Sequence, residues 1–128
     1  MLALDTNVLV RFLTRDDPVQ SPRARDLLRD NDTWAGVTVL LETEWVLRSV
    51  YRYAAPEFLA AIRALGGLAR LEIEEVTAVL RALGWHEQGM DFADALHAAL
   101  GNHCEAFATF DKACIEAAAQ VGLATREP

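Results

Sequence analysis

Short apolar runs alternate with segments of helical periodicity along this chain, and no other feature constrains the fold as strongly. Strand-like runs are expected at residues 2–5, 34–37, 106–110 and 122–125, with helical patterns between them. Parallel strands need a helix-length connection to return to the same edge of a sheet. The sequence therefore predicts one α/β domain over residues 1–128, a three-layer sandwich whose central, mainly parallel sheet is flanked by helices on both faces.

The helical segments carry recognisable start and stop signals. Ser21 followed by Pro22 predicts a helix start, with the serine as N-cap and the proline in the first helical position. Gly84 is expected to end a helix that begins near residue 73. Helical patterns are expected at residues 7–13, 22–31, 38–53, 56–67, 73–83, 91–102 and 112–120.

The charge balance limits the class of function. The formal net charge is −7, which argues against passive nucleic-acid binding through a basic face. It does not argue against a nuclease, because acids gathered around a bound Mg²⁺ count as negative only until the metal arrives. The longest uncharged apolar run, residues 34–41, is well short of the ~18 residues that span a membrane. A cytoplasmic protein is expected.

Cysteine and histidine give no metal-ligand pattern. Cys104 and Cys114 lack the CxxC spacing, so both are expected to be semi-buried thiols rather than zinc or redox ligands. His97 is likewise expected to be a semi-buried histidine with its hydrogen bonds satisfied. Any metal site in this chain must therefore be built from oxygen ligands.

Four acids lie where solubility does not explain them. Asp5 and Asp111 directly follow apolar runs, and the carboxyl ends of parallel strands are where such sheets bind ligands. Glu42 lies in the apolar helical segment 38–53, and Asp94 lies among alanine, leucine and phenylalanine. Two acids at strand ends and two on neighbouring helices could all point into one cleft.

Each acid also has a purely structural interpretation. Asp5, Asp91 and Asp111 precede helical patterns and could be N-caps. Glu42 could lie on a helix surface, although its neighbour Glu44, with Arg48 four residues on as an ion-pair partner, fits that role better. Capping and metal ligation are compatible, so both interpretations remain open for the three aspartates.

Electrostatic magnitudes indicate what a convergent cluster would do. Two carboxylates ~5 Å apart at an effective dielectric of ~20 repel by roughly 3 kcal/mol, so four together need protons or cations. Oxygen ligands without His or Cys select a hard ion, Mg²⁺ or Mn²⁺. Such sites activate water and stabilise phosphoryl transition states.

Four segments, LDTNVLVRFL, LLETEWVL, DFADALHAAL and ATFDKAC, occur in an order and at a spacing that resemble PIN-domain proteins. The resemblance covers nearly the whole chain and is strongest to the VapC-type toxins of bacterial toxin–antitoxin pairs. It implies a PIN-like sandwich and a Mg²⁺-dependent endoribonuclease that hydrolyses RNA with metal-activated water. It also implies a cognate antitoxin as partner, and a homodimer.

The family's site residues transfer position by position. The resemblance assigns catalysis and metal ligation to four acids: Asp5, Glu42, Asp94 and Asp111. It assigns supporting roles to neighbouring polar side chains: Thr6, Asn7, Asp91 and Thr109. Contacts to the RNA backbone need cations, and the candidates are Arg11, Arg15 and Lys112, followed by Arg23 and Arg25. Each of these cations could equally belong to a solvated helix face.

Three other functions compete with the toxin interpretation. A phospho-acceptor signalling domain would need an acidic pair at the first strand end, whereas Asp16 and Asp17 lie beyond the first helix. A PIN-fold protein-binding module without catalysis is disfavoured because all four acids are present. A PIN nuclease that works outside a toxin–antitoxin pair, for example in RNA processing, remains open.

Overall fold

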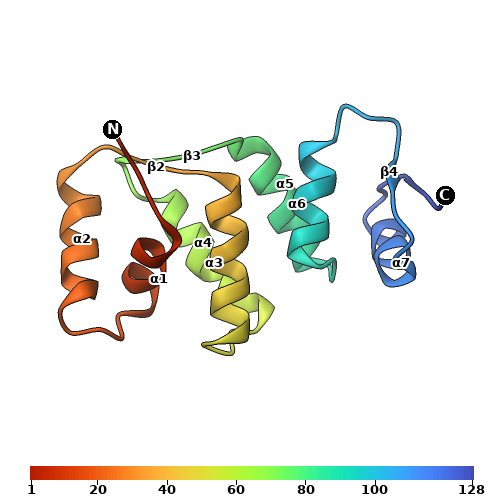
Figure 1. Cartoon of the computed structure of the whole chain (residues 1–128). Helices are drawn as coiled ribbons and strands as arrows, with labels where there is room; N and C mark the ends of the chain where they lie inside the picture. Colours follow the sequence, from red (N-terminus) through yellow and green to blue (C-terminus); the bar gives the residue numbers. More distant parts are fainter. The chain divides into compact units, whose positions relative to one another are not determined.

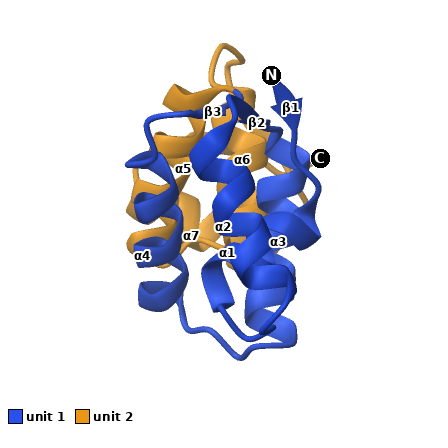
Figure 2. Cartoon of the chain, turned by 90° about the vertical axis from the view of Figure 1, so that its left-hand side faces the viewer, with its two compact units in different colours: residues 1–74 blue, residues 75–128 orange.

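A computed structural model describes all of residues 1–128, and the chain divides into two compact units. Unit 1 is Met1–Glu74 and unit 2 is Glu75–Pro128, coloured separately in Figure 2. None of the helices has the length and apolar character needed to cross a membrane.

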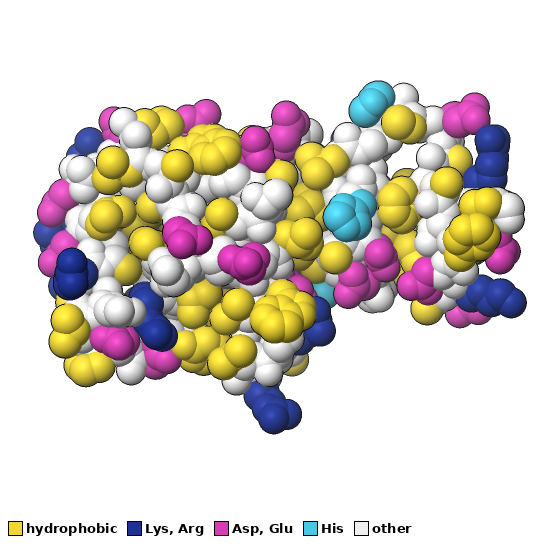
Figure 3. Space-filling view, viewed as in Figure 1, with side chains coloured by type: hydrophobic (Ala, Val, Ile, Leu, Met, Phe, Trp, Pro, Cys, Tyr) yellow, Lys and Arg dark blue, Asp and Glu magenta, His cyan; other side chains and the backbone are white.

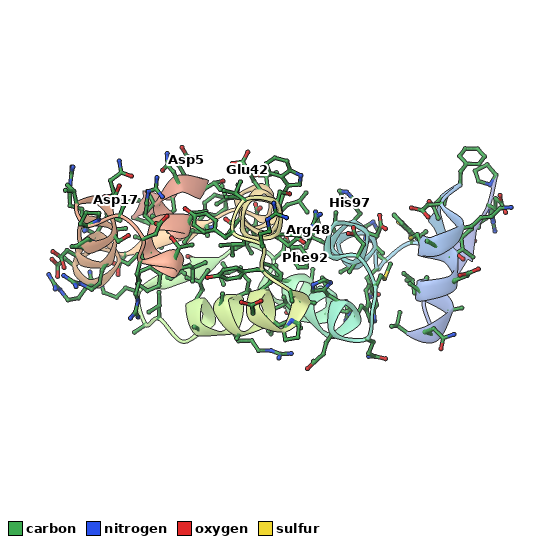
Figure 4. All side chains as sticks on the ribbon, turned by 90° about the horizontal axis from the view of Figure 1, so that it is seen from below. Asp5, Asp17, Glu42, Arg48, Phe92 and His97 are labelled. Carbon is green, nitrogen blue, oxygen red and sulfur yellow. The ribbon has the colours of Figure 1, made fainter.

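Unit 1 is built on a three-stranded parallel sheet in the order β1-β2-β3. The strands are β1 (Leu2–Ala3), β2 (Thr33–Ala35) and β3 (Leu71–Ile73). The register pairs Leu2 with Thr33 and Thr33 with Leu71. Two helices connect each pair of strands along the chain (Figure 1), namely α1 (Thr6–Thr14), α2 (Gln20–Asp30), α3 (Val37–Ser49) and α4 (Ala55–Gly66). Within this unit, Figure 4 shows α2, α1 and α3 in one row and α4 outside it.

Unit 2 contains two packed helices, a two-stranded parallel pair and a final helix. Its elements are α5 (Val76–Glu87), α6 (Phe92–Leu100), β4 (Phe107–Ala108), α7 (Lys112–Gln120) and β5 (Thr125–Arg126). The strands β4 and β5 pair in parallel, Phe107 opposite Thr125. Every strand pair in both units is thus parallel, and the predicted α/β class is confirmed.

Helical periodicity explains which side chains form the interior of each unit. In unit 1, α1, α3 and α4 bury Leu9, Leu40, Leu47, Ile62 and Leu65 almost completely. Each such side chain contributes about 1.5–3 kcal/mol relative to an exposed one. In unit 2, α5 and α6 bury apolar side chains that include Val79, Phe92 and Leu96. These interiors hold in place the helices that carry or follow the candidate acids.

The segment around residue 73 differs from its prediction. Leu71–Ile73 forms β3 on the free edge of β2 rather than the start of a helix. Glu75 then adopts a left-handed conformation (φ 50°), and α5 runs through Gly84 to Glu87. A glycine inside a helix costs about 1 kcal/mol relative to alanine, which the buried Leu83 beside it offsets.

The start of α2 also differs from its prediction, because Ser21 is not the N-cap. The helix begins at Gln20, and the Asp17 carboxylate accepts hydrogen bonds from the backbone N–H groups of Val19 (2.9 Å) and Gln20 (2.7 Å). Ser21 is buried one residue inside the helix, where its hydroxyl accepts from the Asp17 N–H. The Asp17 carboxylate, three residues before the first helical residue Gln20, therefore caps the helix.

The sequence favours a surface position for Glu44, but this residue is buried at 5% exposure. Its Oε1 atom still pairs with Arg48 Nε at 2.9 Å, as its spacing predicts. The partner guanidinium is half exposed and brings the charge compensation that a buried carboxylate needs.

Candidate functional site

The predicted acids line two hollows, one in each unit. The hollow in unit 1 has a volume of about 330 Å³, and we call it the Asp5–Glu42 hollow. It is lined by Asp5, Thr6, Asn7, Val10, Arg11, Glu42 and Val46. It thus contains two predicted metal ligands, two predicted supporting residues and one predicted substrate cation.

Asp5 reaches this hollow because it joins β1 to α1. Its backbone is extended (φ −87°, ψ 158°), and its Oδ1 atom accepts a hydrogen bond from the Thr6 N–H at 2.7 Å. The structural interpretation of Asp5 as an N-cap is confirmed. A carboxylate has about four acceptor positions, so one capping bond leaves the others free for a ligand.

Glu42 reaches the same hollow from α3. The helix buries Leu40, Thr43 and Leu47 and leaves Glu42 exposed. Figure 4 shows Glu42 and Asp5 as neighbours on one side of unit 1. The two carboxylates thus converge from elements that are far apart in the sequence.

Thr6 is the residue of this hollow that structural roles explain least. It is 6% exposed, and its hydroxyl oxygen is the one buried side-chain polar atom in the chain without a hydrogen-bond partner. Leaving a buried hydroxyl unsatisfied costs about 1–3 kcal/mol. An unsatisfied hydroxyl beside two carboxylates fits a site whose ligand supplies the missing hydrogen bond.

The three predicted substrate cations lie in different surroundings. Arg11 lines the Asp5–Glu42 hollow and pairs with Asp16 at 3.2 Å. Arg15 follows α1 in a left-handed conformation (φ 53°) and lines another hollow, together with Arg25. Lys112 is exposed at the start of α7 and lines neither acidic hollow.

The hollow in unit 2 has a volume of about 410 Å³, and we call it the Asp94 hollow. It is lined by Gly89, Asp91, Asp94, Asp111, Ala113, Cys114 and Ala117. Three carboxylates predicted from the sequence therefore lie together here.

Two of these carboxylates cap helices. Asp91 accepts a hydrogen bond from the Asp94 N–H at 3.2 Å and begins α6. Asp111 accepts from the Cys114 N–H at 3.1 Å and begins α7, while its own N–H donates to the Thr109 hydroxyl at 3.0 Å. Both capping interpretations are confirmed, while the supporting role of Thr109 stays a prediction.

Asp94 caps nothing and is half-buried. Burial raises its pKa above the ordinary value, and the charges of Asp91 and Asp111 raise it further. A hydrogen bond with the Cys114 thiol opposes this rise. A bound cation would relieve the same repulsion, so the donor set fits a hard divalent ion.

Cys114 is the residue of this hollow that sequence reasoning missed. It is only 3% exposed instead of semi-buried, and burial together with the Asp94 charge raises the pKa of its thiol to about 11. The signal was its position three residues after Asp111, which places both on one helical face. Cys104, also predicted to be semi-buried, is exposed, as is His97.

The structure brings Asp5 together with Glu42, and Asp91 and Asp111 together with Asp94. No group of three or more His, Cys, Asp or Glu side chains is arranged to hold a metal ion. The convergence of all four predicted ligands on one ion stays a prediction.

Comparison with known proteins finds one family model and one solved structure that are similar to this chain. The family model described as PIN domain matches residues 2–120, a range that includes parts of both units. No curated protein matches. Among solved structures, Mycobacterium tuberculosis VapC20, described as a sarcin-ricin loop cleaving toxin, is similar over 100% of both chains, with 20% sequence identity and a TM-score of 0.44.

Proposed function

This chain belongs to the PIN domain family, whose members are typically nucleases, and we propose that it is a metal-dependent endoribonuclease. Its substrate is RNA, and the reaction is hydrolysis of a phosphodiester bond. The observation that carries the proposal is the Asp94 hollow, where a half-buried carboxylate with a raised pKa lies beside Asp91 and Asp111. Groups perturbed by burial and like charge in a hollow are typical of catalytic sites.

We propose that Asp5 and Glu42 of unit 1 and Asp94 and Asp111 of unit 2 are the ligands for the catalytic Mg²⁺, with Mn²⁺ as a substitute. All four offer carboxylate oxygens, which these ions prefer. The ion, when bound, supplies positive charge that favours deprotonation of the attacking water and stabilises the phosphoryl transition state. The raised pKa of Asp94 and the unsatisfied hydroxyl of Thr6 support this assignment.

The chain's own residues then have separate tasks. One of the four carboxylates accepts a proton from the attacking water. The Thr6 hydroxyl and the Asn7 amide donate hydrogen bonds that orient water or phosphate in the Asp5–Glu42 hollow. Asp91 and Asp111 hold the helix starts that position Asp94 and Cys114.

We further propose that this nuclease is the toxin of a toxin–antitoxin pair and acts in the cytoplasm as a homodimer. The support is the resemblance of the four acid-bearing segments to VapC-type toxins. Trp45 on α3 is 56% exposed, which offers an apolar contact for an antitoxin or a second copy.

The test is cleavage of total bacterial RNA by the full-length protein, with Mg²⁺ or with EDTA. Asp94→Asn is compared with Asp26→Asn, which removes the same charge from an acid that pairs with Arg25 and Arg29 on the surface. We expect the wild type and Asp26→Asn to cleave only with Mg²⁺, and Asp94→Asn to leave the RNA intact.

Three outcomes would contradict the proposal or its toxin assignment. Cleavage by Asp94→Asn at the wild-type rate would show that the activity comes from a contaminant or from another site. If the wild type cleaves no RNA and calorimetry detects no Mn²⁺ binding, a PIN-fold binding module without catalysis would be favoured. Cleavage without any genetically adjacent antitoxin would favour a nuclease of RNA processing.

A further inference from the structure

We propose that a second hollow of unit 1, between α1 and α2, binds a backbone phosphate of single-stranded RNA next to the cleavage site. We call it the guanidinium hollow, and its volume is about 320 Å³. Its polar lining is Asn7, Arg11, Gln20 and Arg23, and its apolar lining includes Ala24 and Leu27. This inference rests on the proposed ribonuclease function and assigns a substrate contact to a different part of the surface.

The guanidinium hollow adjoins the Asp5–Glu42 hollow at α1. Asn7 and Arg11 line both of them. An RNA strand with one phosphate near Asp5 and Glu42 can therefore place a neighbouring phosphate in the guanidinium hollow. From the first hollow to the second, the charged lining changes from carboxylates to arginines. Carboxylates would bind a phosphate through a metal ion, whereas arginines bind the next phosphate directly.

Arg23 is available for such a phosphate because no acid of unit 1 pairs with it. The other two arginines of α2 are engaged: Arg25 contacts Asp26 at 3.1 Å, and Arg29 contacts Asp30 at 2.7 Å. Figure 3 shows Arg side chains interspersed with acids over α1 and α2. The arginine of α2 that lines the guanidinium hollow is thus the one whose charge is not already neutralised.

Arg11 is held in a fixed orientation by its neighbours. Its Nε donates to Gln20 Oε1 at 2.8 Å, and its Nη1 donates to the Tyr51 hydroxyl at 3.1 Å and to Asp16. The Tyr51 hydroxyl in turn donates to Asp16 Oδ2 at 2.7 Å. Hydrogen bonding by Tyr51 and Thr14 lowers the pKa of Asp16, which keeps that carboxylate charged.

One end of the Arg11 guanidinium remains unused. Its Nη2 atom makes no hydrogen bond in the structure, while Nε and Nη1 are engaged. A planar guanidinium fixed on one side presents its remaining N–H groups at a low entropic cost. Tyr51 and Asp16 are therefore positioning residues, which act on the RNA through Arg11.

The test measures binding of a short fluorescein-labelled single-stranded RNA by fluorescence anisotropy, in EDTA to prevent cleavage and at several salt concentrations. Arg23→Gln is compared with Arg29→Gln, a matched control that removes the same charge from the same helix outside the hollow. Arg11→Lys keeps the charge but loses the fork, and Tyr51→Phe removes only the positioning hydroxyl.

We expect Arg23→Gln and Arg11→Lys to weaken RNA binding by about tenfold each, the effect of losing a charged hydrogen bond. Arg23→Gln should also reduce the slope of log K against log salt by about 0.7, the value for one phosphate on a single strand. Tyr51→Phe should weaken binding by about fivefold and raise KM in Mg²⁺-dependent cleavage without changing kcat. Arg29→Gln should bind like the wild type.

Equal effects of Arg23→Gln and Arg29→Gln would overturn the inference, because only long-range charge would then matter. Wild-type binding by all variants, or no binding by the wild type, would also overturn it. Poly-L-glutamate serves as a second probe: if Arg23→Gln loses this ligand and keeps RNA, the hollow belongs to an acidic protein partner. Failure of the ribonuclease proposal is seen separately, as absence of Mg²⁺-dependent cleavage by a protein that still binds RNA through Arg23.

Discussion

Replacing Thr6 with valine should stabilise the metal-free protein, although it removes a hydrogen-bonding group. The two side chains have nearly the same shape and a similar helix propensity. The Thr6 hydroxyl is buried and has no partner, so its removal recovers the desolvation penalty of about 1–3 kcal/mol, less any packing strain that the new methyl group introduces. We expect a gain of about 1–2 kcal/mol in the free energy of unfolding.

The expected change in melting temperature follows from the length of the chain. An unfolding entropy of about 2.1 cal/mol/K per residue over 128 residues gives about 0.27 kcal/mol/K. Thr6→Val should therefore raise Tm by about 4–7 °C in EDTA. The measurement is a thermal melt followed by circular dichroism, repeated with Mg²⁺.

Thr43→Val is the matched control for this experiment. Thr43 is also fully buried in a helix, but its hydroxyl donates to the Val39 carbonyl at 2.7 Å. The same substitution there removes a satisfied hydrogen bond, so Tm should fall or stay unchanged. On addition of Mg²⁺ we expect Thr6→Val to gain less stability than the wild type gains, because the hydroxyl no longer contributes to the site.

A neutral or destabilising Thr6→Val in EDTA would refute this reasoning. It would mean that the Thr6 hydroxyl already forms a hydrogen bond in the metal-free protein. If Thr6→Val and Thr43→Val raised Tm equally, the cause would be the added methyl group and not the removal of an unsatisfied hydroxyl.

Two further predictions concern charge and pH. Asp94 has a folded-state pKa above its unfolded value, so its stabilising effect is complete below the unfolded pKa and is lost as pH rises through the folded pKa. Asp94→Asn should remove this loss of stability at neutral pH. Denaturant melts in EDTA should therefore show that the variant is as stable as the wild type or more stable. A less stable variant would contradict the clustering of Asp94 with Asp91 and Asp111. Asp17 has the opposite sign, because backbone hydrogen bonds from Gln20 and Val19 lower its pKa. The stability contributed by Asp17 is present above the unfolded pKa and is lost as pH falls through the folded pKa. Asp17→Ala should therefore lower Tm at neutral pH and leave Tm unchanged in strong acid. A variant whose Tm equals that of the wild type at neutral pH would refute the capping role.

The sequence predicts helices better than strands in this protein. The helix predicted at 112–120 matches its observed bounds, because Asp111 caps it and its alanines favour helix. The strand Leu71–Ile73 is not predicted, because an alternation of apolar and charged residues over three positions is too short to distinguish a strand, and its conformation depends on pairing with β2. Local sequence does not contain such a long-range contact.

The sequence predicts where each candidate site residue lies relative to the neighbouring strand or helix. Asp5 and Asp111 are recognisable because each lies between an apolar run and a helical pattern, and Asp91 is recognisable because it directly precedes a helical pattern. The burial of Glu44 is not predictable, since its spacing to Arg48 is the same on an exposed or a buried helix face. The unsatisfied state of Thr6 becomes visible only once α1 is packed.

The two cysteines make this protein suitable for single-site chemical labelling without mutagenesis. A maleimide reacts with a thiolate, and at neutral pH the Cys114 thiol, buried and with a pKa of about 11, is almost entirely protonated. Cys104 is exposed and lies between α6 and β4, away from the lining of the Asp94 hollow. A fluorophore would therefore attach to Cys104 alone and leave the acids of the proposed active site unmodified.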